Sequence, residues 1–106
     1  MNQAVDLGAA DQQGGEQQLT GQQVAGVMNA HIQSMYSCVS AELRRGGALG
    51  KVRIDLAIEG SGNVLGATVR AGSPAFQQCI GQRVRGIHFP RFSAPRMGAS
   101  YSFSVD

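Results

Sequence analysis

The sequence has no tryptophan, only two cysteines, and no apolar run long enough to cross a bilayer. It also lacks the charged start and apolar stretch of a secretory signal. If the domain works outside the cytoplasm, we expect its export or anchoring segment to lie upstream of Met1. With 106 residues, of which 42% are hydrophobic, the chain can form one modest domain with a real core.

The local motifs of several enzyme classes are also missing. There is no Cys-x-x-Cys pair, no Gly-x-Ser-x-Gly nucleophile elbow and no phosphate-binding loop. The carboxylates Asp55 and Glu59 fall on the polar face of a predicted strand, where solvated charge is the usual role. We therefore expect no catalytic residues, no cofactor and no enzymatic activity.

The first 19 residues contain no aromatic and no basic residue, and they are rich in Gln, Gly and Ala. Such a segment cannot bury enough apolar surface to offset the cost of ordering it. We predict a disordered linker over 1–19 and a folded domain over 20–106. The domain is mildly basic, because three of the seven acidic residues lie in the linker. This charge would suit an anionic partner, although solubility alone explains charges of this size.

Hydrophobic spacing predicts a helix first and a hairpin second. Apolar residues recur at three-four spacing over residues 21–45, which predicts one long helix that ends at Gly46 and Gly47. From residue 50 the period becomes two, which predicts a strand with one buried face. Residues 60–63 read as its turn and 64–70 as the return strand. The expected inward residues of the hairpin are Val52, Ile54, Leu56, Ile58, Leu65, Ala67 and Val69.

The remaining sequence predicts a second helix and a final strand. Ser73 is a suitable N-cap and Pro74 suits the first helical position. A proline-bounded connector follows over residues 88–95, and apolar and serine residues alternate over 100–105, as in a strand. The predicted order is α-β-β-α-β, which defines an α+β fold.

Cys38 and Cys79 fall in the two predicted helices, 41 residues apart. A disulfide between them would stabilise the fold by about 4 kcal/mol in the loop-entropy model. It would also place the chain in an oxidising compartment. The alternative is a pair of buried free cysteines that act as small apolar residues.

With His31 and His88, these cysteines have the residue count of a Cys2His2 zinc site. The spacing argues against it, because His31 and Cys38 are separated by about 10 Å along a helix axis. Zinc needs its ligands within about 2.0 to 2.3 Å of one ion. We therefore expect no metal site, and keep a metal-binding or thiol-redox domain as the alternative function.

Two further surfaces could bind a macromolecule. Arg83, Arg85, Arg91 and Arg96 lie near Phe89 and Phe92, a mixture that can hold nucleic acid. We expect no nucleic acid, because such residues usually form a solvated rim over core aromatics. The last strand could accept an extended peptide if it lies at the sheet edge. The alternative is an edge that its own neighbours protect.

Several short motifs, in this order, resemble the AgmX/PglI C-terminal domain family, a TonB- and TolA-like family of myxobacterial gliding-motility and other cell-envelope proteins. The resemblance covers about residues 20–106. It rests on Cys38, Gly50-Lys51-Val52, Gly60-Ser61-Gly62-Asn63-Val64, Cys79, Phe89-Pro90 and Tyr101-Ser102-Phe103.

The resemblance implies two helices packed on a three-stranded antiparallel sheet, in a periplasmic domain anchored to the inner membrane. Such a domain binds an outer-membrane or periplasmic protein, often by strand addition, and transmits force from a proton-driven inner-membrane motor. TonB-like domains can also exchange strands, so a homodimer is an alternative. The implied partner-binding residues are Tyr101, Ser102, Phe103, Ser104 and Val105, with Arg91 and Arg96 as nearby charged contacts.

Overall fold

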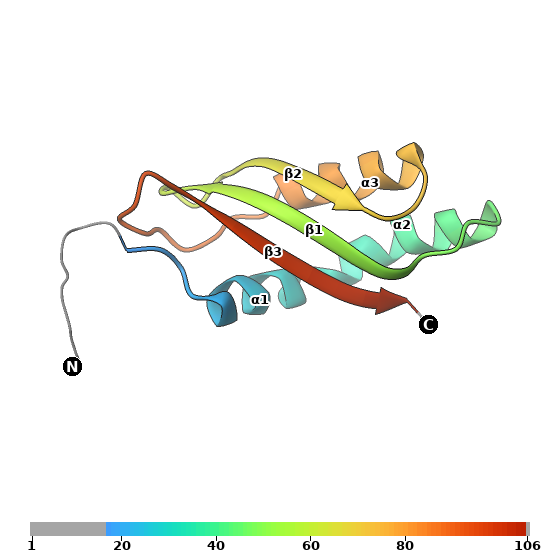
Figure 1. Ribbon diagram of the computed structural model, residues 1–106, viewed down its shortest axis with the longest axis horizontal. Helices are drawn as coiled ribbons and strands as arrows, with labels where there is room; N and C mark the ends of the chain where they lie inside the picture. Colours follow the sequence, from blue (N-terminus) through green and yellow to red (C-terminus); the bar gives the residue numbers. More distant parts are fainter. Residues whose placement is uncertain (1–16, 106) are drawn as a thin grey trace.

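The computed structural model describes residues 17–105, which form three helices and one three-stranded antiparallel sheet. This confirms the predicted α+β class, with one helix more than predicted. In chain order the elements are α1 (Gly21–Ala30), α2 (Ile32–Arg44), β1 (Gly50–Glu59), β2 (Val64–Arg70), α3 (Pro74–Arg85) and β3 (Arg96–Val105), as Figure 1 shows.

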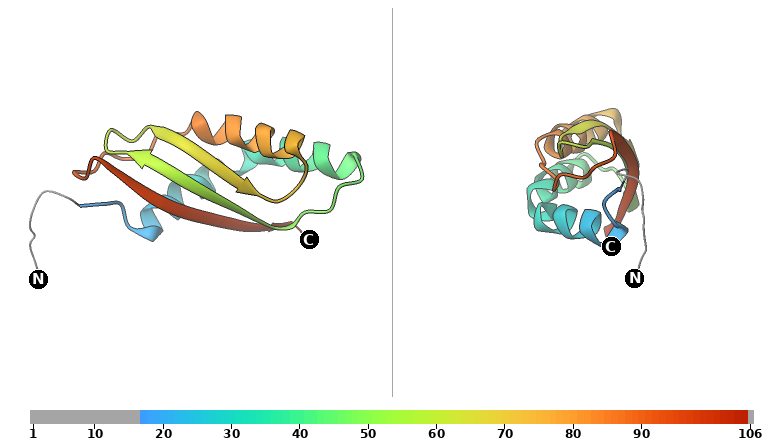
Figure 2. Two further views of the ribbon diagram at one scale, coloured as in Figure 1. Left: turned by 45° about the horizontal axis from the view of Figure 1, so that its top comes forward. Right: turned by 90° about the vertical axis from the view of Figure 1, so that its left-hand side faces the viewer.

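The strand order is β2-β1-β3, so β1 is central and the last strand lies at an edge. Every residue of β1 has a partner on β3, from Gly50 opposite Val105 to Glu59 opposite Arg96. The helices form a second layer against one face of the sheet (Figure 2). Within it α1 contacts β3, α3 contacts β2, and α2 packs against α3 and α1. The opposite face of the sheet is covered by no helix or strand among residues 17–105.

The hairpin forms where it was predicted, with one error. The four inward residues of β1 are at most 4% exposed, which confirms the alternation. Leu65, however, was predicted to face the core and is 52% exposed. The register shifts between Ala57 and Ile58, and Ile58 pairs with Val64. This bulge adds one residue to β2 and turns Leu65 outward.

The predicted helix over 21–45 is in fact two helices, and this prediction was wrong. His31 interrupts it with φ −109° and ψ 4°, outside the helical range. Its N–H bonds to the carbonyl of Met28, three residues back, at 3.0 Å. The ring Nδ1 lies 3.0 Å from the carbonyl of Val27. The break lets α1 lie against β3 while α2 packs on α3.

The second predicted helix begins as expected. Ser73 caps α3, because its hydroxyl accepts a hydrogen bond from the Phe76 N–H at 3.3 Å, and Pro74 is the first helical residue. The helix buries Phe76, Ile80 and Val84 completely against the sheet.

The first described residues, 17–19, fall in the predicted linker but pack on the domain. Leu19 is only 8% exposed, and its N–H donates to the sulfur of Met97 at 3.3 Å. Thr20 and Gln23 then close a capping box at the start of α1. The rest of the linker prediction, over residues 1–16, lies outside the described residues, as does Asp106.

Candidate functional site

The last strand offers a long free edge. Among residues 17–105, β3 has a strand partner only on its β1 side. Near its start the chain itself runs alongside, because the Ala94 N–H donates to the carbonyl of Gln17 at 3.0 Å. The Gln17 N–H in turn donates to the Ser93 hydroxyl at 2.8 Å. From Gly98 to Val105 the outer edge has no such neighbour among the described residues. Unpaired strand edges can accept another extended chain.

The inner side of this edge is aromatic and only partly covered. Tyr101 and Phe103 are partly buried, and their ring centroids are 6.3 Å apart. The Tyr101 hydroxyl donates a hydrogen bond to the side chain of Asn29 on α1. Burial raises the pKa of Tyr101, and the nearby hydroxyl of Tyr36 raises it further. Tyr36, on α2 and near Tyr101, is 52% exposed. We call the side chains of Tyr36, Tyr101 and Phe103 the aromatic shelf.

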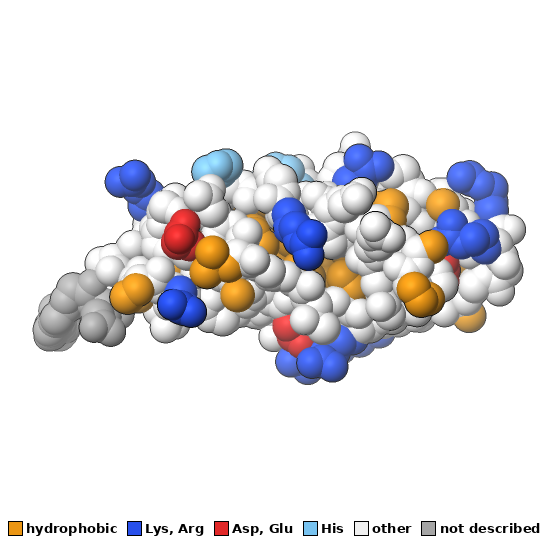
Figure 3. Space-filling model, turned by 90° about the horizontal axis from the view of Figure 1, so that it is seen from above, with side chains coloured by type: hydrophobic (Ala, Val, Ile, Leu, Met, Phe, Trp, Pro, Cys, Tyr) orange, Lys and Arg blue, Asp and Glu red, His pale blue; other side chains and the backbone are white. Residues whose placement is uncertain are grey.

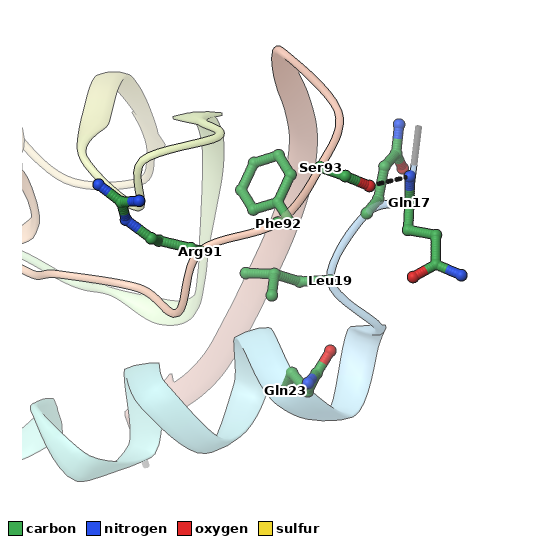
Figure 4. A pocket seen from close by; sticks show the side chains of 7 residues that line it. Gln17, Leu19, Gln23, Arg91, Phe92 and Ser93 are labelled. Atoms are coloured by element: carbon green, nitrogen blue, oxygen red, sulfur yellow. Dashed lines mark hydrogen bonds between the residues drawn. The ribbon is translucent and has the colours of Figure 1, made fainter. Parts of the chain in front are cut away.

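The two arginines that were predicted as charged contacts near this strand lie in different elements. Arg96 is the first residue of β3, opposite Glu59 on β1. Arg91 lies in the preceding loop, at a cavity of about 460 Å³ beside the start of α1. Figure 4 shows the Gln17–Ser93 hydrogen bond in this cavity. The lining residues are Gln17, Gln18, Leu19, Gln23, Arg91, Phe92 and Ser93.

The two cysteines form a disulfide that joins α2 to α3, with Cα atoms 5.8 Å apart. Cys38 is 1% exposed and Cys79 is partly buried against the core. His88 forms an isolated bridge with Asn63, while His31 stands at the break between α1 and α2. Over residues 17–105, no three His, Cys, Asp or Glu residues gather as ligands for a metal ion.

The arginines and phenylalanines near α3 do not form one surface. Phe89 is 4% exposed, so its ring cannot stack on a base, and Phe92 is partly buried. Arg83 extends to the hydroxyl of Ser37 on α2 at 3.2 Å. The basic side chains lie in separate groups over the face that Figure 3 shows.

Sequence reasoning missed two polar clusters that the fold assembles. Glu42, on α2, is 3% exposed and binds the start of α3 through Ser73. Asp55, predicted to be a solvated carboxylate, instead binds two arginines on the open face of the sheet. The sequence identifies Ser73 as a helix cap, but no residue near Ser73 in the sequence indicates that Glu42 is its partner.

No helix among the described residues is long and apolar enough to span a membrane. No protein-family model, curated protein or solved structure matches the chain.

Proposed function

We propose that this chain is a non-enzymatic protein-interaction domain that binds an extended segment of a partner by adding it to the free edge of β3. The observation that carries the proposal is this edge, which has no strand partner on its outer side from Gly98 to Val105 among the described residues. Strand addition satisfies the backbone groups of both chains, while side chains on alternate positions supply specificity. The inward-facing Tyr101 and Phe103 would contact inward side chains of the partner.

We further propose that the domain belongs to an envelope-spanning complex of the TonB/TolA type. The Cys38–Cys79 disulfide supports an oxidising compartment, which the periplasm is. The order of short motifs at residues 50–52, 60–64, 89–90 and 101–103 supports membership of the TonB-like family. In this arrangement an upstream segment anchors the chain to the inner membrane and couples it to a proton-driven motor. The partner is an outer-membrane or periplasmic protein, with gliding motility as the process.

Backbone pairing can be separated from side-chain docking with methylated peptides. We would titrate the domain with peptides that alternate apolar and polar residues, taken from periplasmic segments of outer-membrane proteins. Each binding peptide is then made in two forms, with N-methyl groups on its odd or its even amides. In an added strand only one of these sets points its N–H groups at β3.

Strand addition therefore predicts that one methylated form loses binding and the other keeps it. Equal binding by both forms would contradict the mechanism. The homodimer alternative has its own signature, because a second copy pairing at β3 would compete with the peptide. Peptide affinity would then fall as the protein concentration rises, with a matching rise in sedimentation coefficient.

A further inference from the structure

Two arginines face each other on the open face of the sheet, away from the helices. The register of β1 and β2 places Arg53 directly opposite Arg70. Their side chains are 57% and 63% exposed. Like charges directly opposite each other destabilise an antiparallel pair. Such a local cost to folding is expected where a surface serves a function.

One carboxylate holds both guanidinium groups in place. Asp55 accepts hydrogen bonds from Nε of Arg70 at 2.6 Å and from Nε of Arg53 at 2.9 Å. These bonds, that from Arg70 first, lower the pKa of Asp55. The cluster still carries two positive charges against one negative charge. Lys51, the preceding outward residue on β1, adds a further positive charge.

The orientation of the arginines leaves donors for a ligand. Asp55 uses only the Nε of each guanidinium group, and one Nη of Arg53 lies 3.5 Å from the Ser100 hydroxyl. Among residues 17–105, the remaining Nη groups of both arginines have no other hydrogen-bond partner. The free N–H groups of a guanidinium can bind a carboxylate through two parallel, charge-assisted hydrogen bonds.

The neighbouring strand keeps this cluster accessible. From Gly98 onward the outward residues of β3 are small, with Ser102 opposite Arg53 and Ser100 opposite Asp55. Their short side chains leave room for a chain that lies across the face, and their hydroxyls add donors. The outward positions of the three strands carry no aromatic ring, so this face lacks a platform for stacked bases.

We propose that this open face binds an acidic protein segment, whose carboxylates pair with Arg53 and Arg70. Lys51 and Arg53 are two residues apart, about 7 Å along a strand, which matches alternate side chains of an extended acidic peptide. The surface is distinct from the edge of β3. Binding of an acidic segment here is therefore independent of strand addition at that edge.

The probe is an eight-residue peptide with Glu at alternate positions, titrated at about 0.15 M salt so that exposed long-range attraction is screened. Its Gln counterpart is the neutral control. We expect saturable shifts of the Arg53 and Arg70 Nε–H signals in NMR spectra with the Glu peptide only. Arg53→Gln and Arg70→Gln should each weaken binding about tenfold, as expected for a charged hydrogen bond. Arg44→Gln, an equal charge change on α2, should change it less than about twofold.

Asp55→Asn gives the sharpest result. Asp55 supplies the negative charge of the cluster and repels an acidic ligand, while Asn can still accept a hydrogen bond from an arginine Nε–H, so Asp55→Asn should bind the Glu peptide several-fold more tightly. Weaker binding by Asp55→Asn, or an equal loss in Arg44→Gln, would overturn the proposal. If oligothymidylate or inorganic phosphate bound at Arg53 and Arg70 more tightly than the Glu peptide does, the proposal would also be overturned, because the ligand would then be a phosphate.

Discussion

Glu42, near the end of α2, accepts hydrogen bonds from both the N–H and the hydroxyl of Ser73, at 2.8 and 2.7 Å. Ser73 caps α3, so one buried carboxylate ties the end of α2 to the start of α3. Arg45 adds a third bond, at 2.6 Å. Together with the Cys38–Cys79 disulfide, this contact joins the two helices.

Stability should depend on the charge of Glu42. Hydrogen bonds from Ser73, and then from Arg45, lower its pKa below the ordinary value of 4.5. The ionised carboxylate therefore stabilises the fold above pH 4.5, and this contribution is lost as the pH falls through the folded-state pKa. We expect Glu42→Gln to unfold at lower urea concentration than the native chain at pH 7. The difference should shrink as the pH falls below 4.5, and a difference that stays unchanged down to the lowest pH at which the native chain still folds would contradict this role.

The disulfide should contribute strongly to stability. It closes a loop with a sequence separation of 41 residues, so its loss should cost about 4 kcal/mol in the loop-entropy model. We expect reductant to lower the midpoint of urea unfolding in the native chain but not in the Cys38→Ala, Cys79→Ala double variant. Native mass spectrometry should show a mass two protons below that of the reduced chain. Bound zinc instead would favour the metal-binding alternative.

The turn between β1 and β2 should tolerate no side chain at Gly62. This glycine has φ +99°, and a Cβ there would overlap the carbonyl oxygen of Phe89. We expect Gly62→Ala to destabilise the domain by about 2 kcal/mol or more, from backbone strain and displacement of Phe89. Gly66→Ala, on β2, is the matched control, because its Cβ would meet nothing within 4 Å. If both variants lost the same free energy of unfolding in urea denaturation, the contact with Phe89 would not matter.

The aromatic shelf of Tyr36, Tyr101 and Phe103 should affect binding more than folding. Tyr36 is 52% exposed near Tyr101, and Leu43 is 48% exposed on the same helix. We expect Tyr36→Ala to weaken the binding of a strand-adding peptide by about 1 kcal/mol or more, which is roughly a fivefold loss of affinity. Leu43→Ala should leave the affinity unchanged, and both variants should unfold at nearly the native temperature. A loss in both would mean that the peptide binds elsewhere on α2.

Features of the fold that depend on adjacent residues could be predicted from the sequence, and features that depend on distant residues could not. The alternation in β1 and the Ser73-Pro74 start of α3 are set by adjacent residues, so they were predicted correctly. The break at His31 was missed because the apolar spacing continues through it. Leu65 was misplaced because a bulge depends on the pairing of two strands.

The sites follow the same rule. The period-two pattern of residues 100–105 predicted a strand, but its place at the edge follows from the strand order. The pairing of Arg53 with Arg70 depends on the β1–β2 register, and the partner of Glu42 lies 31 residues away. Neither can be read from a local motif.

The most direct test of strand addition is a map of backbone contacts in a complex with a binding peptide. Isotope-edited NMR would record NOEs between peptide backbone protons and the labelled domain. We predict a ladder of inter-chain backbone NOEs along residues 98–105. The amides of these residues that point away from β1 should become protected from hydrogen exchange. Contacts confined to the Arg91 cavity, to β2 or to the helices would contradict the central claim.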